Sequence, residues 1–151
     1  MELILTYIIN IRFMRKGKEK TIKIRIYFSD TDALGIVYHA NYLDFAERAR
    51  TELLRDCGFD VKAFTNSNVF AVVRKADIEY FSPGILEDLI SVTAFVSHVG
   101  KTSMEVTHVM VCDKTQKPIC TVKCVLVYVT KKDDVLTATP IPSEFSSAFF
   151  N

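Results

Sequence analysis

Residues 21–57 read TIKIRIYFSDTDALGIVYHANYLDFAERARTELLRDC, and the pattern of apolar residues changes twice along this stretch. From Thr21 to Phe28, the apolar residues Ile22, Ile24, Ile26 and Phe28 alternate with more polar ones, which is the period of a half-buried strand. The next residues, SDTDALG, favour a turn. The side chains of Asp and Thr form hydrogen bonds to nearby backbone groups, and Gly adopts the backbone conformations that turns need. The sequence therefore predicts a strand that ends directly before this turn.

Residues 41–57 have the period of a helix. Apolar side chains recur at steps of three and four and form one face: Tyr42, Phe45, Ala46, Ala49, Leu53, Leu54 and Cys57. Asp44 lies near the start and Arg55 near the end, which matches the helix dipole, and Gly58 follows where helices prefer to stop. The pattern predicts a helix of about 17 residues, roughly 25 Å long.

The rest of the chain is typical of strands separated by turns. Four further strands are expected at residues 69–80, 90–96, 104–112 and 119–130. The last of these contains the uninterrupted apolar run CVLVYV, which is typical of a central strand covered on both faces. The tail carries Phe145, Phe149 and Phe150 after two prolines, and it is expected either to cap an edge of the sheet or to fray.

This order of elements predicts an α+β fold, in which a long central helix is wrapped by a curved antiparallel sheet of about five strands. A sheet with one apolar face must bury that face, and the single long helix is available to cover it. Such a sheet leaves two edges and an incompletely covered surface. We therefore also expect the chain to form a homo-oligomer.

The composition is that of an ordinary globular domain. The chain has 151 residues, of which 49% are hydrophobic and 25% charged, and its net charge is +1. That balance favours one domain and offers no long-range attraction to nucleic acid or to a membrane surface. The four cysteines, Cys57, Cys112, Cys120 and Cys124, lack metal-ligand spacing and are expected to be free thiols in a reducing compartment.

Residues 1–20 are interpreted as an N-terminal extension and residues 21–151 as the folded domain. The first ten residues are apolar but lack the basic start and cleavage site of a signal peptide, and they are too few to span a bilayer as a helix. A basic segment follows Met14, so an internal start at that methionine is an alternative. Without an export signal, the cytoplasm is the expected location.

Two carboxylates, Asp30 and Asp32, fall in the turn directly before the predicted helix. A helix start offers unpaired N–H groups and partial positive charge, which suit an oxyanion, and Gly35 lets the backbone approach a ligand closely. With His39 near the same helix start, this set has the groups needed to hydrolyse an ester or thioester. Each also has a structural explanation, since Asp commonly caps turns, a single His is often structural and Tyr38 can simply pack.

The segment DTDALGIVYHANYLDFAERARTELL closely resembles the active-site signature of the 4-hydroxybenzoyl-CoA thioesterase family, in the YbgC-like branch associated with the Tol–Pal gene cluster. The residues that match this signature are Thr31, Asp32, Gly35, Ile36, Val37, Tyr38, His39, Asn41, Tyr42 and the run from Glu47 to Glu52. The resemblance implies a hotdog fold and hydrolysis of an acyl-CoA-type thioester to acid and thiol. CoA would be part of the substrate, and neither a metal nor another cofactor is implied.

The resemblance also assigns roles to residues. Asp32 maps onto the essential carboxylate, which would either attack the thioester carbonyl or activate a water, and both mechanisms stay open. A backbone N–H near His39 would stabilise the oxyanion, and the His39 side chain is a second catalytic candidate. Gly35 and Tyr38 are candidates for substrate binding.

Family members assemble as dimers or tetramers with the active site at a subunit boundary, so the resemblance implies a homo-oligomer here as well. It further implies that basic and hydroxyl residues on the surface hold the CoA phosphates, and Lys101, Thr102 and Ser103 are candidates for that contact. The polarity of a solvated hairpin explains these three residues equally well. A link to the cell-envelope Tol–Pal system is implied by the resemblance alone.

Other functions use the same fold. An acyl-carrier-protein thioesterase or an aromatic acyl-CoA thioesterase would act by the same chemistry. A weakly catalytic hotdog protein would serve as an interaction module, although Asp32 and His39 are both present here. A hotdog dehydratase needs a differently arranged His and acidic residue, and the sequence contains no such motif.

Overall fold

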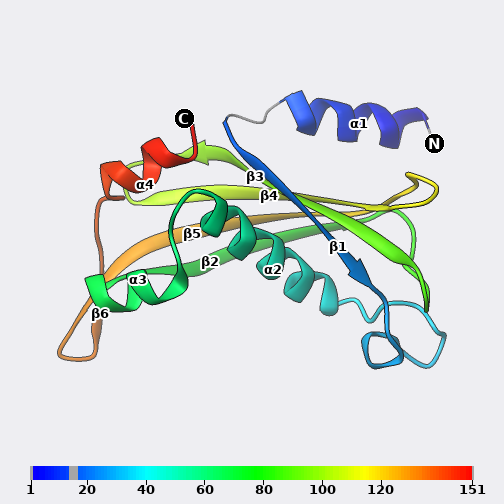
Figure 1. Cartoon of the computed structure of the whole chain (residues 1–151), viewed down its shortest axis with the longest axis horizontal. Helices are drawn as coiled ribbons and strands as arrows, with labels where there is room; N and C mark the ends of the chain where they lie inside the picture. The colour runs from blue at the N-terminus through cyan, green and yellow to red at the C-terminus, as the bar shows by residue number, and fades with distance from the viewer. Residues whose placement is uncertain (1, 14–16, 151) are drawn as a thin grey trace.

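A computed structural model describes residues 2–13 and 17–150. Its elements are α1 (Glu2–Phe13), β1 (Glu19–Arg25), the short 3-10 helix η1 (Phe28–Asp30), α2 (Asn41–Asp56), α3 (Val61–Ser67), β2 (Val69–Tyr80), β3 (Leu89–Val99), β4 (Ser103–Cys112), β5 (Pro118–Lys132), β6 (Val135–Ala138) and α4 (Ser143–Ala148). The predicted first strand, long helix and four later strands are all present. The first strand ends at Arg25, earlier than predicted, because the chain turns into η1, where Phe28 is exposed and not on the buried face. The α+β fold, with one long helix against a curved antiparallel sheet, is confirmed (Figure 1).

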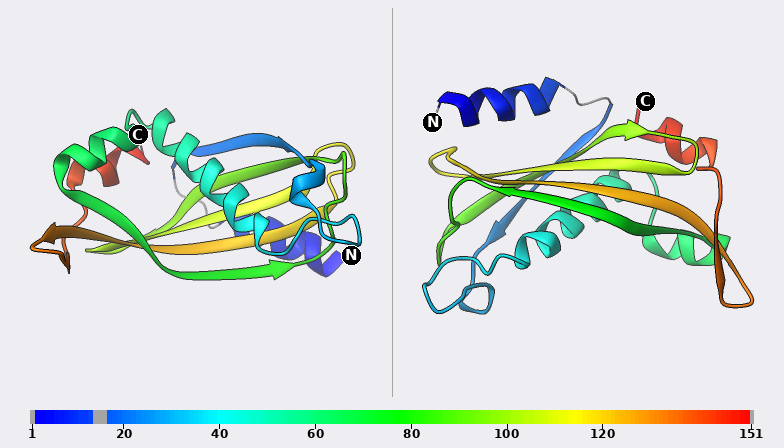
Figure 2. Two further views of the ribbon diagram at one scale, coloured as in Figure 1. Left: turned by 90° about the horizontal axis from the view of Figure 1, so that it is seen from below. Right: turned by 180° about the vertical axis from the view of Figure 1, so that it is seen from behind.

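Six antiparallel strands form one sheet in the order β1-β3-β4-β5-β2, and β6 pairs with β5 outside this path. Figure 2 shows the sheet curling around α2, which crosses its concave face. Strand β5 pairs with β2, β4 and β6, so the apolar run lies in a central strand. Its Cys124, Leu126 and Tyr128 are buried, and Val125 and Val127 on the other face are half-buried. The sixth strand, β6, was not predicted. It forms a hairpin whose turn residues, Asp133 and Asp134, both have positive φ, as two-residue hairpin turns prefer.

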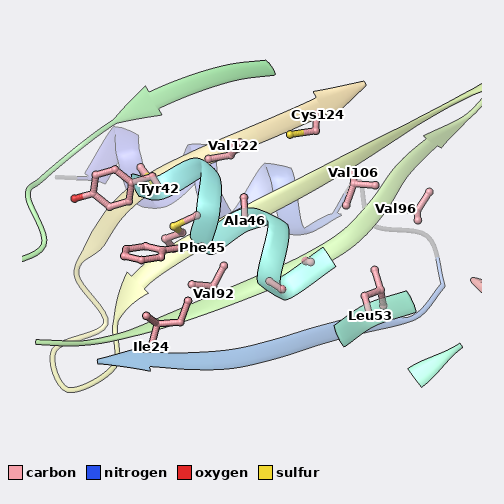
Figure 3. Close-up of a cluster of buried hydrophobic side chains, with 14 of the residues drawn as sticks. Ile24, Tyr42, Phe45, Ala46, Leu53, Val92, Val96, Val106, Val122 and Cys124 are labelled. Atoms are coloured by element: carbon pink, nitrogen blue, oxygen red, sulfur yellow. The ribbon is translucent and has the colours of Figure 1, made fainter. Parts of the chain in front are cut away.

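Helix α2 buries the face that its period predicted. The buried residues of this helix are Tyr42, Phe45, Ala46, Ala49 and Leu53. Figure 3 shows several of them against Val92, Val106 and Val122 of the sheet, with Ile24 of β1 at the side. The alanines let the helix backbone approach the strands closely. Leu53, which is only 1% exposed, contributes about 1.5–3 kcal/mol by its burial.

The opposite face of the sheet carries a smaller apolar cluster. Phe95, Val109 and Val111 belong to it, and they point away from α2 because they alternate with the residues that contact the helix. Ile8 and Ile11 of α1 pack on this cluster, so the apolar start of the chain covers the outer face of the sheet. None of the described helices is long and apolar enough to cross a membrane.

The C-terminal tail packs into the core and does not fray. Phe145 and Phe149 are buried in the main cluster, and the Phe145 ring lies 4.3 Å from that of Phe59. The four cysteines are free thiols, as expected. Burial raises the pKa of Cys120 to about 12, so this thiol is neutral at physiological pH.

Candidate active site

The chain between β1 and α2 folds into a compact loop that carries the signature residues. Thr31 and Val37 form an isolated β-bridge, and the Asp32 N–H donates to the Ile36 carbonyl at 2.9 Å. The Gly35 N–H donates to the Asp32 carbonyl at 3.0 Å. This turn needs glycine because Gly35 has a φ of 72°, a left-handed conformation that other residues adopt with strain. The turn therefore fixes the position of Asp32.

Asp32 is half-buried, and one of its carboxylate oxygens is committed to the turn. Its Oδ1 accepts the N–H of Leu34 at 2.8 Å, which is an Asx-turn contact. No protein donor to its Oδ2 is found in the part of the chain that the structure describes. One oxygen thus orients the carboxylate, and the other is available to a reactant.

Asp30 has the contacts of a structural residue. Its Oδ2 accepts the N–H of Tyr27 at 2.9 Å, at the start of η1. Its backbone carbonyl accepts the Tyr38 N–H and the Asn41 side-chain amide, each at 2.9 Å. Asp30 therefore ties the loop to the first turn of α2 through its backbone carbonyl. Its carboxylate, like that of Asp32, accepts one backbone N–H.

His39 lies just before Asn41, the first residue of α2. Its side chain is exposed, and the centroid of its ring is 4.5 Å from that of Tyr38. Over residues 2–13 and 17–150, no protein acceptor is found for the N–H groups of His39 and Ala40. Free N–H groups at the start of a helix, together with the helix dipole, can stabilise developing negative charge.

Two tyrosines and a buried glycine hold this loop against the sheet. The Tyr80 hydroxyl donates to the His39 carbonyl at 2.9 Å. The Gly84 N–H donates to the Tyr42 hydroxyl at 3.0 Å, and the Gly84 carbonyl accepts the Val37 N–H at 2.9 Å. A Cβ at Gly84 would lie 2.8 Å from the terminal methyl group of Ile90, so a larger residue would force the core side chains to shift. Burial raises the pKa of Tyr42, which keeps its hydroxyl protonated.

A cavity of about 340 Å³, which we call the loop cavity, adjoins these residues; it is lined by Ile36, Val37, His39, Tyr42, Tyr80, Phe81, Ser82 and Pro83. A second cavity of about 290 Å³, the helix cavity, lies under the second half of α2 and reaches Phe70 and Ala71 of β2. Phe70 and Tyr80 are ten residues apart on one strand, which corresponds to about 33 Å. The two cavities therefore lie toward opposite ends of β2.

Four of the predicted site residues, Asp32, Gly35, Tyr38 and His39, lie together in the loop before α2. Sequence reasoning missed Tyr80 and Gly84, which position this loop. Their only signal was Pro83-Gly84, which was interpreted as a break at the end of a strand. Among the residues that the structure describes, no three His, Cys, Asp or Glu side chains lie close enough together to hold a metal ion.

The predicted CoA contacts lie elsewhere in the chain. The Lys101 carbonyl accepts the Ile141 N–H at 2.9 Å, and the Thr102 carbonyl accepts the Tyr128 N–H at 2.8 Å. The turn of Lys101, Thr102 and Ser103 is thus packed beside the C-terminal segment, at the end of the sheet remote from the loop before α2 (Figure 1). A single chain does not bring this turn next to Asp32.

The chain resembles known proteins in sequence and in fold. A sequence model of the thioesterase-like superfamily matches residues 26–149. The chain belongs to this superfamily. The thioesterase-like chain is 43% identical over 84 residues to the acyl-CoA thioester hydrolase YbgC of Escherichia coli O6:H1, a match that covers 56% of the chain and 63% of the relative. It is 46% identical over 77 residues to the acyl-CoA thioesterase YbgC of Haemophilus influenzae, which covers 50% and 57%.

The match thus spans less than two thirds of the length of these two relatives. Solved structures extend the likeness of this thioesterase-like chain to most of its fold. It superimposes on a 4-hydroxybenzoyl-CoA thioesterase mutant in complex with 4-hydroxybenzoyl-CoA with a TM-score of 0.82, at 14% identity over 88% of the chain and 99% of that structure. The TM-score with Slr0204, a 1,4-dihydroxy-2-naphthoyl-CoA thioesterase from Synechocystis, is 0.80, at 16% identity over 87% and 96%. These likenesses confirm the hotdog fold.

Proposed function

We propose that this chain hydrolyses an acyl-CoA-type thioester to a free acid and a thiol, with Asp32 as the catalytic carboxylate. The observation that carries the proposal is the loop itself. It holds a carboxylate with one oriented and one available oxygen close in sequence to the unpaired N–H groups of His39 and Ala40. Membership of the thioesterase-like superfamily and the names of the YbgC relatives support the same chemistry.

In the proposed reaction, Asp32 Oδ2 or a water that it deprotonates attacks the thioester carbonyl carbon. The carbonyl oxygen gains negative charge, which the N–H groups of His39 and Ala40 stabilise. The C–S bond then breaks, and the thiolate leaves and takes up a proton. If Asp32 attacks directly, a water must next hydrolyse the anhydride that joins the acyl group to the carboxylate, which restores Asp32.

Three further side chains or backbone positions have proposed roles at this site. The His39 imidazole borders the loop cavity and is our second catalytic candidate, as the group that orients the attacking water. Gly35 and Tyr38 belong to the same loop and are our candidates for contact with the substrate.

The free thiols of the chain are consistent with a reducing compartment, and the cytoplasm is the location we propose.

We further propose that two copies of the chain pair along β2. This strand is at an edge of the sheet and has twelve residues. It exposes Val72 and Val73, whose side chains are 36% and 54% accessible. A long edge strand with exposed apolar side chains is normally covered in a native assembly, and a second copy of the same strand can cover it symmetrically.

An antiparallel pair of β2 strands would join the two separated halves of the site. The Tyr80 end of one strand would lie beside the Phe70 end of the other. The catalytic loop of one copy would then meet the helix cavity of the second copy and its turn of Lys101, Thr102 and Ser103. This arrangement supports a CoA contact for these three residues that a single chain does not allow.

The decisive experiment is a hydrolysis screen of the purified chain over short, long and aromatic acyl-CoAs and acyl-carrier-protein thioesters. Turnover of acyl-CoAs that is lost in Asp32→Asn supports the proposal. A preference for carrier-protein or aromatic thioesters would select one of the related thioesterase functions. No turnover of any thioester by the folded protein would contradict the proposal and favour an interaction module.

A further inference from the structure

The helix cavity is mostly apolar but contains a cation. Its apolar walls are Leu53, Leu54, Met104, Leu126, Tyr128 and Phe149. Arg50, on the same face of α2, also lines it. The volume, about 290 Å³, is at the lower end of the range found for small-molecule sites. The cavity therefore fits a small, largely apolar group, and Arg50 is a cationic side chain that such a group can contact.

Arg50 lines the helix cavity where α2 faces the sheet, together with Met104 of β4 and Leu126 of β5. Burial lowers the pKa of His108 on β4 to about 3; the bond of His108 to a backbone carbonyl opposes this fall, and the charge of Arg50 adds to it. Burial raises the pKa of Cys124 on β5, and Arg50 opposes that rise. His108 and Cys124 both belong to the sheet surface under the helix.

Arg50 has no anionic partner among residues 2–13 and 17–150. It takes part in none of the ion pairs found over the residues that the structure describes. Glu47, one turn earlier on α2, also borders the cavity, but it is exposed and its carboxylate accepts the hydroxyl of Thr51 at 2.8 Å. The cavity therefore contains a half-buried cation that no neighbouring carboxylate neutralises.

This arrangement discriminates between ligands. A plain alkyl group filling the helix cavity would remove water from Arg50 and supply no acceptor, and stripping a charged group of its hydrogen bonds is costly. A group with an apolar stem and a terminal carboxylate would fill the same space and pair with the guanidinium, often through two parallel hydrogen bonds. The volume corresponds to about ten groups of the size of a water molecule, which suits a chain of about six carbons.

We propose that Arg50 is a specificity-determining residue, and that the helix cavity takes an acyl group whose far end carries a carboxylate. The proposal rests on the thioesterase function and names its substrate class, the thioesters of dicarboxylic acids. In the antiparallel pair of β2 strands, the side of the cavity that is lined by Phe70 and Ala71 meets the catalytic loop of the other copy. The reacting carbonyl would lie at that side and the distal carboxylate inside, beside Arg50.

The test compares adipoyl-CoA with hexanoyl-CoA, which have the same chain length and differ in the terminal carboxylate. For the wild-type chain we expect kcat/KM to be about tenfold or more higher with adipoyl-CoA, which is the size of effect expected for one charge-assisted hydrogen bond. Arg50→Met should abolish this preference and Arg50→Lys should keep part of it. Arg48→Met is the matched control: Arg48 is exposed on the same helix, 5.8 Å from the Phe45 ring, and this variant should keep the wild-type preference.

A second measurement tests the proposal even if Arg50→Met fails to fold. Free adipate should raise the melting temperature of the wild-type chain, hexanoate should raise it less, and Arg50→Lys should reduce the effect of adipate. Equal kcat/KM for the two thioesters in the wild type, or a preference that survives in Arg50→Met, would overturn the role of Arg50 and leave the thioesterase function intact. Absence of turnover with every thioester in the wider screen would instead contradict the function itself.

Discussion

Replacing Asp32 by asparagine separates the chemistry of the carboxylate from its place in the fold. Asparagine has the same shape, and its Oδ1 can still accept the Leu34 N–H that Asp32 accepts at 2.8 Å. What is lost is the charge on that hydrogen bond, worth about 1 kcal/mol as the difference between a charged and a neutral bond. For a chain of this size, that loss lowers the melting temperature by about 2–4 °C.

The same substitution removes the attacking or proton-accepting group. Losing a positioned acid or base typically costs about 10²- to 10⁴-fold in rate, which corresponds to about 3–5 kcal/mol in the barrier. We therefore expect Asp32→Asn to remain folded and to lose nearly all hydrolysis. Steady-state kinetics with acyl-CoA, together with a thermal melt, measure both effects on one sample.

Asp30→Asn is the matched control. Its amide oxygen can still accept the Tyr27 N–H, and the backbone contacts of residue 30 are unchanged. We expect a loss of about tenfold or less, equivalent to about 1.4 kcal/mol in the barrier. Equal losses in the two variants, with unchanged melting, would refute the division of roles between the two aspartates. So would an Asp32→Asn enzyme that keeps more than a tenth of the wild-type rate.

Three other predictions test the helix start, the assembly and the core. His39→Ala should keep measurable turnover, well above Asp32→Asn, because the proposed oxyanion donors are backbone N–H groups; a His39→Ala variant that is folded but as inactive as Asp32→Asn would make the imidazole a full catalytic partner. Light scattering at micromolar concentration should give at least twice the mass of one 17.1 kDa chain, and a single-chain mass would contradict pairing along β2. Burial lowers the pKa of His108 from 6.5 to about 3 in the folded chain. Between these two pH values the unfolded chain binds a proton at this residue and the folded chain does not, so the free energy of unfolding should fall as the pH drops from about 6.5 toward 3. This group contributes at most about 1.4 kcal/mol per pH unit to that fall. His108→Met should reduce that slope, and an unchanged slope in denaturant melts would assign it to other groups.

The fold could be predicted because its main elements follow one period each. Helix α2 buries the face that its pattern marks, and β1 follows its alternation as far as Arg25, although the pattern itself continues to Phe28. Strand β6 could not be predicted, since its four residues are all exposed and carry no period. Helix α4 was missed because its burial depends on Phe145 reaching Phe59, a contact between residues far apart in the sequence.

The candidate site divides in the same way. Asp32, Gly35, Tyr38 and His39 are close in sequence, so the motif that contains them also places them in one loop. The hydrogen bond from the Tyr80 hydroxyl to the His39 carbonyl joins residues 41 positions apart, so no local sequence pattern predicts it. In the sequence, Arg50 is an ordinary basic residue of an amphipathic helix, and its spacing gives no reason to assign it a function. Only the packing of α2 on the sheet directs its charge toward His108 and Cys124.

The packing of α1 on the outer face of the sheet has a practical consequence for recombinant production. A chain shortened to begin at Met14 would keep the loop, α2 and both cavities, but it would expose Phe95, Val109 and Val111 to water. Contiguous apolar surface of this kind promotes aggregation in solution. Expression of the chain with residues 1–13 in place should therefore give the more soluble protein, whatever its catalytic rate.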